Sequence, residues 1–202
     1  MIFAVLYDVV MRAADRAGLS RRRSALASET HGRVLEIGAG TGLEFAHYAP
    51  GLQVFAIEPD LAMLARAADR RQSVAATVTL IAADAQALPF RDAVFDTALS
   101  ALTFCTIPDP SRAVHELHRV LRPTGTAFLL EHVRARHRAL AWTQVVLTPL
   151  WKRVAGGCHL ARRTSDLFRA SRFDVDIQRA SLDGALVEFV ARPTPANQQP
   201  TG

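Results

Sequence analysis

Acidic side chains and closely spaced glycines stand together in one short stretch of the chain, in a pattern that could hold a cofactor. The stretch VLEIGAGTGLEF, residues 34–45, is an apolar run that leads into a glycine-rich segment. Glycines directly after a buried strand let the backbone approach a nucleotide-type ligand closely. The second apolar segment, QVFAIEPD at 53–60, carries Glu58 twenty-two residues after Glu36. An acid at this place accepts hydrogen bonds from ribose hydroxyls.

The spacing of the glycines discriminates among the nucleotide-type cofactors. A phosphate-binding loop needs a lysine after its last glycine, but Lys152 is the only lysine of the chain. A dinucleotide site needs a third glycine at position 43, where the chain has Leu43. Glu36 would repel a pyrophosphate and would attract a cation. A ligand with a ribose and a positive charge but no phosphate fits both acids, so we expect S-adenosylmethionine.

Strand-like and helix-like segments alternate along the chain, which predicts how these residues are positioned. Strands are expected at 34–37, 53–58, up to about 81, 93–102, 126–133, 174–180 and 185–191. Helices are expected at 61–70, 109–121 and 162–173, with a turn at 122–125. The last two strands are too close for a crossover helix. We therefore predict an α/β fold, a doubly wound, seven-stranded, mostly parallel sheet with an antiparallel C-terminal hairpin.

Two of these helices have a predicted buried face. Asp60 is the expected N-cap of the first, and the inward face is expected to be Leu61, Leu64, Ala65 and Ala68. In the second, the predicted inward residues are Val114, Leu117, Val120 and Leu121. Ligands of such sheets bind outside the carboxyl ends of the strands. The strand ends expected to form the site are 36–42, Glu58, Asp84, Ser100 and Glu131-His132.

A single domain is predicted over residues 1–192, with a leading helical segment at 1–30 and a disordered tail at 193–202. The first eleven residues are apolar, but a membrane span needs roughly 20. Helical spacing puts Ile2, Leu6, Val9 and Val10 on one face, with Phe3 beside them. This face is expected to pack on the domain; the alternative is a helix that lies on a membrane, with Arg21, Arg22 and Arg23 at the head groups.

The order of these motifs resembles class I S-adenosylmethionine-dependent methyltransferases of type 11, over residues 33–133. The resemblance rests on E-x-G-x-G-x-G, the acid Glu58, Asp84-Ala85, LPFRDAVFD and HRVLRPTGTAFLLEH. It implies that the cofactor is S-adenosylmethionine and that its amino-acid end lies on the glycine turn. The implied cofactor-binding residues are Glu36, Gly38, Ala39, Gly40, Gly42, Glu58, Pro59, Asp84, Ala85 and Ser100. Tyr7, in a Tyr-Asp pair of the leading segment, is implied near the cofactor or is a core residue.

Residues 134–161 are expected to cover the acceptor pocket. Their apolar side chains, with arginines around them, suit a hydrophobic acceptor or a lipid surface, or else complete the core; they are Trp142, Val145, Val146, Leu147, Leu150 and Trp151. The stretch GGCHLARRT is similar to thiol S-methyltransferases, which implies a thiol acceptor. Bacterial phosphatidylethanolamine N-methyltransferases come next in similarity and quinone C-methyltransferases third. His132 is the candidate proton acceptor, and Cys158 and Trp142 are candidates to line the pocket.

The bulk composition limits the other readings. The 24 Lys and Arg against 19 Asp and Glu give a net charge of +5, but the arginines are scattered, so no nucleic-acid partner is expected. Two cysteines without C-x-x-C spacing suit a cytoplasmic protein, with peripheral contact to the inner membrane face as an option. His115 and His118 have no third ligand, so no metal is expected. A dehydrogenase and a binding partner without turnover are the remaining alternatives; the sequence leaves the oligomeric state open.

Overall fold

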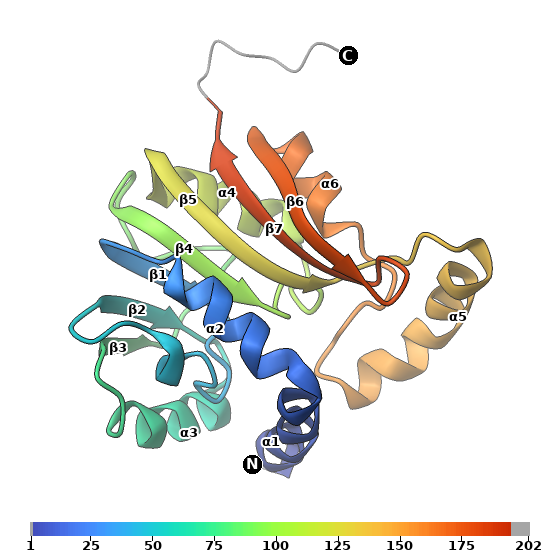
Figure 1. Ribbon diagram of the computed structural model, residues 1–202, viewed down its shortest axis with the longest axis horizontal. Coiled ribbons are helices and arrows are strands. Elements are labelled where there is room, and N and C mark those ends of the chain that lie inside the picture. Colours follow the sequence, from blue (N-terminus) through green and yellow to red (C-terminus); the bar gives the residue numbers. More distant parts are fainter. Residues whose placement is uncertain (1, 195–202) are drawn as a thin grey trace.

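Seven strands form one sheet in the order β3-β2-β1-β4-β5-β7-β6 in the computed structural model, which describes residues 2–194 (Figure 1). The strands are β1 (Arg33–Ile37), β2 (Gln53–Ile57), β3 (Thr77–Ile81), β4 (Phe95–Ala101), β5 (Leu121–His132), β6 (Phe173–Ser181) and β7 (Leu186–Pro193). The first five are parallel, and β7 is antiparallel to both β5 and β6. The predicted fold class is confirmed.

The strand order places a ligand crevice at the end of β1. Ile37, the last residue of β1, is paired with Ile57 on one side and with Ser100 on the other. The chain leaves β1 toward β2 and later returns on the opposite side to form β4, so the connections diverge at this point. Such a switch point opens a crevice outside the carboxyl ends of the strands. Glu36, Glu58 and Ser100 therefore meet at one edge of the sheet.

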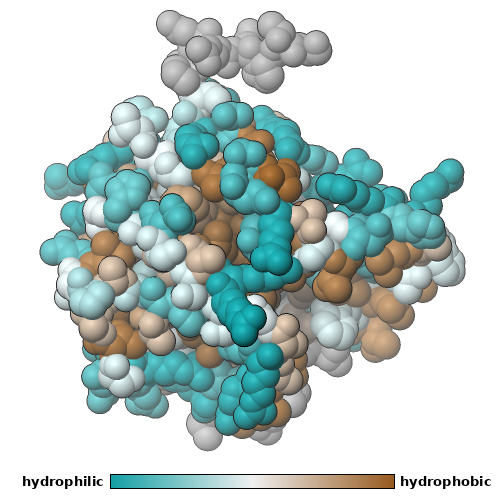
Figure 2. Space-filling model, in the orientation of Figure 1, coloured by the Kyte–Doolittle hydropathy of each residue, from teal (hydrophilic) through white to brown (hydrophobic). Residues whose placement is uncertain are grey.

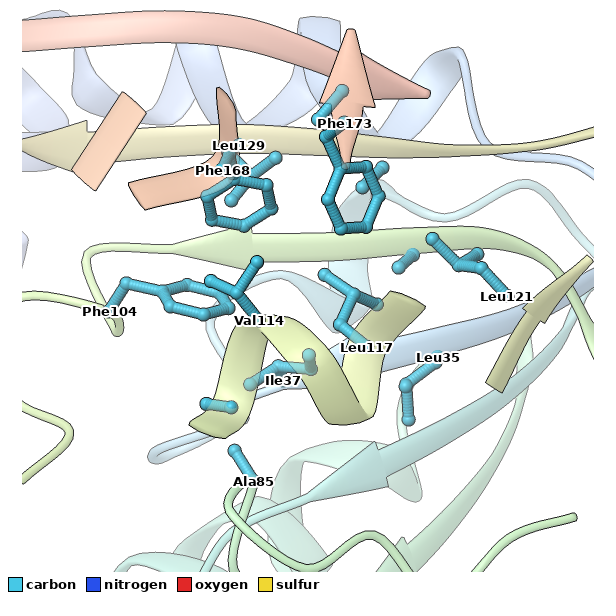
Figure 3. Close-up of a cluster of buried hydrophobic side chains, with 14 of the residues drawn as sticks. Leu35, Ile37, Ala85, Phe104, Val114, Leu117, Leu121, Leu129, Phe168 and Phe173 are labelled. Atoms are coloured by element: carbon cyan, nitrogen blue, oxygen red, sulfur yellow. The ribbon is translucent and has the colours of Figure 1, made fainter. Parts of the chain in front are cut away.

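Helices cover both faces of the sheet (Figure 1). The helical elements are α1 (Ile2–Ala14), η1 (Asp15–Leu19), α2 (Ser20–Ser28), η2 (Phe45–His47), α3 (Leu61–Arg71), α4 (Pro110–Val120), α5 (Arg138–Val154) and α6 (Thr164–Ala170). On the face of α4 and α6, Phe104, Phe168 and Phe173 gather with Leu117 and Leu129 in the larger apolar cluster (Figure 3). The other face packs against α2 and Ala67 of α3.

The inward face predicted for the 109–121 helix is confirmed and that of the 61–70 helix is wrong. Val114, Leu117 and Val120 of α4 are fully buried. In α3, the Asp60 carboxylate caps the backbone amides of Ala62 and Met63 as predicted. The buried residues of α3 are however Met63 and Ala67, and Leu61 is 70% exposed. The small side chain of Ala67 lets the helix approach the sheet, which turns the predicted residues sideways or outward.

β5 begins five residues earlier than the strand expected at 126. Leu121, predicted as part of the helix face, pairs with Phe95 at the start of β5. The register between β4 and β5 shifts between Phe95 and Thr97. This irregularity lets the segment 122–125, predicted as a turn, continue as strand.

The leading segment is helical, but its buried face differs from the predicted one. Ala4 and Asp8 are the buried residues of α1, whereas Val9 and Val10 are 54% and 53% exposed. The side chains of Ile2, Phe3 and Leu6 are not among those described. The π-helical turn η1 separates α1 from α2, and within it Gly18 has φ 113° and ψ 0°. The direction of α1 is therefore set by a kink at one glycine.

Two of the three consecutive arginines are held inside the protein. Arg23 is 1% exposed, pairs with Asp15 and contacts Glu44. Arg22 pairs with Glu188 of β7 at 3.2 Å. The alternative in which all three meet lipid head groups is therefore wrong.

The predicted pocket cover and the predicted tail are described in part. Residues 138–154 of the predicted cover form α5, which projects from the body of the protein beside the β6–β7 turn (Figure 1). Pro193 of the predicted tail belongs to β7, and the Thr194 amide donates to the Arg172 carbonyl at 2.9 Å. Residues 195–202 lie outside the described part. None of the helices within residues 2–194 combines the length and apolar character needed to cross a membrane.

Candidate cofactor and acceptor site

The glycine turn is fixed to the end of β2 and leaves space above its centre. The amides of Gly38 and Ala39 both donate to the Ile57 carbonyl, at 3.0 and 2.9 Å. A Cβ atom on Gly38 would come within 2.2 Å of the Thr103 side chain, so this glycine is required by packing. A Cβ on Gly40, where φ is +54°, would meet no heavy atom closer than 4.0 Å. The absent side chain at position 40 therefore keeps open space for a ligand.

Glu36 presents a carboxylate with one free oxygen to this edge. The residue is 1% exposed, and the Tyr48 hydroxyl donates to its Oε2 atom at 2.8 Å. Oε1 is buried and has no hydrogen-bond partner among the described residues. Burial raises the pKa of Glu36 to about 8, although the Tyr48 hydrogen bond and the charge of Arg23 oppose this rise. A cationic group next to Oε1 would satisfy the free oxygen and favour the ionised carboxylate.

Glu58 links the end of β2 to the glycine turn. Its Oε2 atom accepts the Gly40 amide and its Oε1 atom accepts the Asp60 amide, both at 3.0 Å. Burial raises its pKa, against the effect of these two hydrogen bonds. Each carboxylate oxygen keeps a second lone pair, which a diol could use. Pro59, between the two acids Glu58 and Asp60, is exposed at the same edge.

The other cofactor residues implied by the resemblance differ in how they are placed. Asp84 is exposed, and its Oδ1 atom accepts the Gln86 amide at 2.8 Å. Ala85 is 6% exposed and belongs to the larger apolar cluster, so its side chain is a packing residue. Ser100, 2% exposed, directs its hydroxyl to Glu131 Oε1 at 3.5 Å. Ala39 and Gly42 are buried within the turn.

Glu131 holds the loop that follows β4 against the glycine turn. Its carboxylate accepts the amides of Thr103, Phe104 and Cys105 at 3.1, 3.0 and 3.3 Å. The residue is fully buried, and burial raises its pKa to about 8 despite these three hydrogen bonds. Because Thr103 packs on Gly38, Glu131 positions one wall of the site. The rule of strand ends indicated Glu131, but its role as a loop clamp was not predicted.

α1 covers the glycine turn through polar contacts. Asp8 Oδ1 accepts the Thr41 hydroxyl at 2.6 Å, and Oδ2 accepts Arg66 Nε at 2.8 Å and pairs with Arg70 at 3.1 Å. The Tyr7 hydroxyl lies 4.0 Å from the Cβ position of Gly40 and is hydrogen-bonded to Arg23. Burial raises the pKa of Tyr7. The structure thus brings Tyr7 and Asp8 to the glycine turn. The contacts of Arg23, Arg66 and Arg70 with this pair were not predicted from the sequence.

The candidate acceptor residues do not form one closed pocket in this structure. His132 is half-buried at the end of β5, its Nδ1 has no partner among the described residues, and burial lowers its pKa. Trp142 is 66% exposed on α5, and the other five large apolar residues predicted with it are 45–62% exposed, so the prediction that these residues complete the core is wrong. Cys158 lies in the segment after α5, next to Cys105. Among the described residues, no group of three His, Cys, Asp or Glu side chains could hold a metal.

The geometry fits S-adenosylmethionine. Its amino-acid end carries an ammonium group, which matches the free buried oxygen of Glu36, and its ribose matches Glu58. The open space over Gly40 leaves room between them. No lysine stands at the turn to bind a phosphate.

The chain is similar to known proteins. Residues 35–129 match the methyltransferase domain family model. The chain is 31% identical over 151 residues to the thiol S-methyltransferase TMT1B of Rattus norvegicus. The matched region covers 72% of this chain and 62% of that protein. It is 35% identical over 114 residues to a phosphatidylethanolamine N-methyltransferase of Cereibacter sphaeroides, over 55% of this chain and 56% of that protein. The chain thus spans less than two thirds of the length of these relatives.

Solved structures agree on the fold. A protein of Thermotoga maritima described as an S-adenosylmethionine-dependent methyltransferase superposes with a TM-score of 0.63, at 21% identity over 94% of this chain and 99% of that one. The glycine turn, the two acids at the ends of β1 and β2 and the antiparallel β7 are therefore explained together: the chain belongs to the class I S-adenosylmethionine-dependent methyltransferases.

Proposed function

We propose that this protein transfers the methyl group of S-adenosylmethionine to a small acceptor, and that the acceptor is a thiol. The observation that carries the proposal is Glu36, whose buried Oε1 atom has no partner among the described residues at the edge where the ligand of this fold binds. Such an oxygen is costly unless a donor or a cation reaches it. The ammonium group of the cofactor supplies that partner.

The contribution of the chain to this reaction is binding and orientation. The bound cofactor supplies an electrophilic methyl group on its sulfonium sulfur. That methyl group would pass to the acceptor sulfur, and the sulfur of the cofactor would leave as a neutral thioether. Glu36 would hold the amino-acid end of the cofactor and Glu58 its ribose, and α1 would cover the glycine turn through Tyr7 and Asp8. Correct placement of the two reactants supplies most of the acceleration in a direct displacement.

A thiol acceptor is supported by the similarity to thiol S-methyltransferases. A thiol has a pKa near 8.5, so only modest help is needed to form the thiolate. We propose that His132 accepts this proton. Burial lowers its pKa, so the imidazole is neutral at pH 7, and Nδ1 has no partner among the described residues. Trp142 and Cys158 are proposed to contact the acceptor.

The test is a transfer assay with methyl-labelled cofactor. The acceptors are hydrogen sulfide, a short alkyl thiol, phosphatidylethanolamine vesicles and a demethylated quinone. We expect label in the thiols and not in the lipid or quinone. Label in the lipid or the quinone alone would replace the thiol proposal by that acceptor. Cofactor binding without turnover on any acceptor would favour a binding partner. Glu36→Gln is expected to abolish transfer, and the exposed Asp174→Asn serves as the control for loss of one negative charge.

We also propose that α5 lies on the surface of an anionic membrane. Its large apolar residues are strongly exposed: Trp142 at 66%, Leu150 at 62%, Val146 at 52% and Trp151 at 45%. The apolar surface on the projecting helix is visible in Figure 2. Only Ala141 and Gln144 of α5 are buried among its described side chains. Isolated exposed apolar residues are ordinary, but a helix face of this size needs a partner.

Charge favours an anionic lipid surface as that partner. No Asp or Glu occurs between Glu131 and Asp166, whereas seven Arg and Lys do. Two copies of the chain that joined through this face would bring these like charges together. A bilayer with anionic lipids accepts both the apolar residues and the cations. The exposed helix α5 is attached to the segment that directly follows β5. The Gln144 side chain accepts the Ala135 amide at 2.8 Å and donates to the Val133 carbonyl at 3.0 Å. A cytoplasmic protein on the inner membrane face fits this arrangement.

A further inference from the structure

The two cysteines of the chain meet, although they are 53 positions apart in the sequence. Cys105 follows β4, and Cys158 follows α5. The His159 amide donates to the Cys105 carbonyl at 2.8 Å, which fixes the two backbones side by side. The Cys105 thiol donates to the Leu102 carbonyl at 3.4 Å and lies close enough to the Cys158 thiol for each sulfur to shift the pKa of the other; both cysteines are free.

The surroundings make the two thiols chemically different. Cys105 is 2% exposed, whereas Cys158 is only half-buried. The hydrogen bond with Cys105, helped by one from Trp151, lowers the pKa of Cys158 to about 7. The same hydrogen bond with Cys158, followed by burial, raises the pKa of Cys105. The more exposed sulfur is thus the one with thiolate character at neutral pH, and a thiol of this kind attacks disulfides efficiently.

The pair lies where the loop after β4 meets the segment after α5. Cys105 belongs to the loop that Glu131 clamps and that packs on the glycine turn through Thr103. The segment of Cys158 is held to the same loop by Arg162, whose guanidinium donates to the carbonyls of Phe104 and Ile107, both at 2.6 Å. A bond between the two sulfurs would therefore join two segments whose backbones are already held together by these hydrogen bonds.

We propose that Cys105 and Cys158 form a thiol–disulfide exchange site that reacts with organic disulfides. The Cys158 thiolate attacks one sulfur of the organic disulfide; the bond between its two sulfurs breaks, and the first half leaves as a thiolate. Cys105 then loses its proton and attacks the Cys158 sulfur, so that the second half leaves as a thiolate. The proton that Cys158 lost to form its thiolate and the proton of Cys105 are balanced by the two protons that the departing thiolates take up to become thiols. The organic disulfide is reduced by two electrons, and the cysteine pair is oxidised to an intramolecular disulfide. This inference goes beyond methyl transfer and does not rest on the identity of the acceptor.

The experiment treats the full chain, after removal of reductant, with 2-hydroxyethyl disulfide and follows its intact mass. We expect the final product to be two hydrogen atoms lighter than the starting protein, with a hydroxyethylthio adduct as a transient. Cys105→Ser is expected to stop at the adduct on Cys158. Cys158→Ser is expected to stay unmodified over the same time, because its remaining thiol is buried. Dithiothreitol should restore the mass of the wild-type chain.

A stable adduct on the wild-type protein, modification of Cys105 in the Cys158→Ser variant, or no reaction at all would each overturn the proposal. Circular dichroism of both variants shows whether they are folded. Labelled-methyl transfer before and after oxidation then measures the consequence of the bond: we expect a reversible loss of transfer to whichever acceptor the protein uses. Because the mass is read without any acceptor, failure of the exchange site and failure of thiol methylation are distinguishable.

Discussion

The carboxylate of Asp8 accepts a hydrogen bond from the hydroxyl of Thr41 at 2.6 Å, and this contact joins the first helix to the middle of the glycine turn. Asp8 has no exposed surface. Burial alone would raise its pKa, but hydrogen bonds from Thr41, Arg66 and Arg70 lower the pKa below the usual value. One ionised side chain thus ties α1 both to the glycine turn and to α3.

Replacement of Asp8 by Ala is expected to release α1 from the turn. The change leaves Thr41 and two partly exposed arginines without their acceptor, and a lost hydrogen bond to a charged group costs about 1.5–3 kcal/mol. We expect the free energy of unfolding, measured in urea, to fall by about 2 kcal/mol and the affinity for S-adenosylhomocysteine to fall with it. Asp69→Ala, an exposed acid of α3, is the control. Equal effects of both variants would contradict the role of Asp8.

Glu36 makes both stability and cofactor affinity depend on pH. Its pKa in the free protein is about 8, raised by burial from 4.5. The folded protein therefore holds a proton that the unfolded chain loses first, and stability falls as the pH rises from about 5 to about 8. Glu131, whose pKa is also about 8, acts in the same direction. We expect the melting temperature of the free protein to decrease over this range, and Glu36→Gln to flatten the decrease.

Under the proposed role of Glu36, the ammonium group of the cofactor favours the ionised carboxylate and reverses this effect. Below pH 8, binding must release the proton of Glu36. The affinity for S-adenosylmethionine is therefore expected to fall by up to about tenfold for each unit by which the pH is lowered. Calorimetry in buffers of different ionisation enthalpy measures the released proton directly. An affinity that is constant between pH 6 and pH 8 would show that Glu36 is already ionised in the free protein.

Gly40→Ala is expected to separate ligand binding from folding. The new methyl group would enter the space above the turn, where no atom is closer than 4.0 Å, and the residue would keep a φ of +54°. The backbone strain costs roughly 1 kcal/mol. Gly51→Ala is a matched control, since its φ is +76° and nothing lies within 4 Å. Both variants should melt slightly earlier, and only Gly40→Ala should lose the stabilisation by S-adenosylhomocysteine.

Vesicle sedimentation tests the membrane surface on α5. We expect binding to vesicles that contain phosphatidylglycerol and little binding to pure phosphatidylcholine. Trp142→Glu is expected to weaken binding by about tenfold or more, because one large apolar side chain is lost and a negative charge is added. Leu182→Glu is the control: it adds the same charge at a residue of the β6–β7 turn that is 71% exposed, and it is expected to weaken binding less. Equal weakening by both variants, or dimers that Trp142→Glu dissociates in the absence of lipid, would contradict the proposal.

The sequence predicted what depends on local periodicity and strand ends. The alternation of strands and helices, the hairpin, the Asp60 cap and the positions of Glu36 and Glu58 follow from patterns within a few residues. The orientation of α3 was not predictable in this way, because Ala67 faces the sheet only as a result of close packing. The same holds for α1, in which a buried acid, Asp8, replaces the apolar face that the pattern favoured. Its partners Arg66 and Arg70 are distant in sequence.

Contacts between distant loops were also beyond the sequence. Glu131 accepts the amides of residues 103–105, and Cys105 lies beside Cys158. Both contacts depend on the path that the connecting segments take in the folded protein. The exposure of α5 is a different case, since a run of apolar residues has the same pattern whether it faces a core or a partner. Only the tertiary structure distinguishes the two.

The kink at Gly18 determines which way the first helix points. Gly18 has φ at 113°, and a Cβ atom added to it would have nothing within 4 Å. A glycine is therefore needed here for its backbone conformation and not because a side chain would clash. An unbroken helix from residue 2 to residue 28 would carry Tyr7 and Asp8 along the axis of α2 and away from Thr41. The placement of Tyr7 and Asp8 over the glycine turn thus depends on the backbone of a half-buried glycine ten positions after Asp8, so a residue outside the candidate site determines how that site is covered.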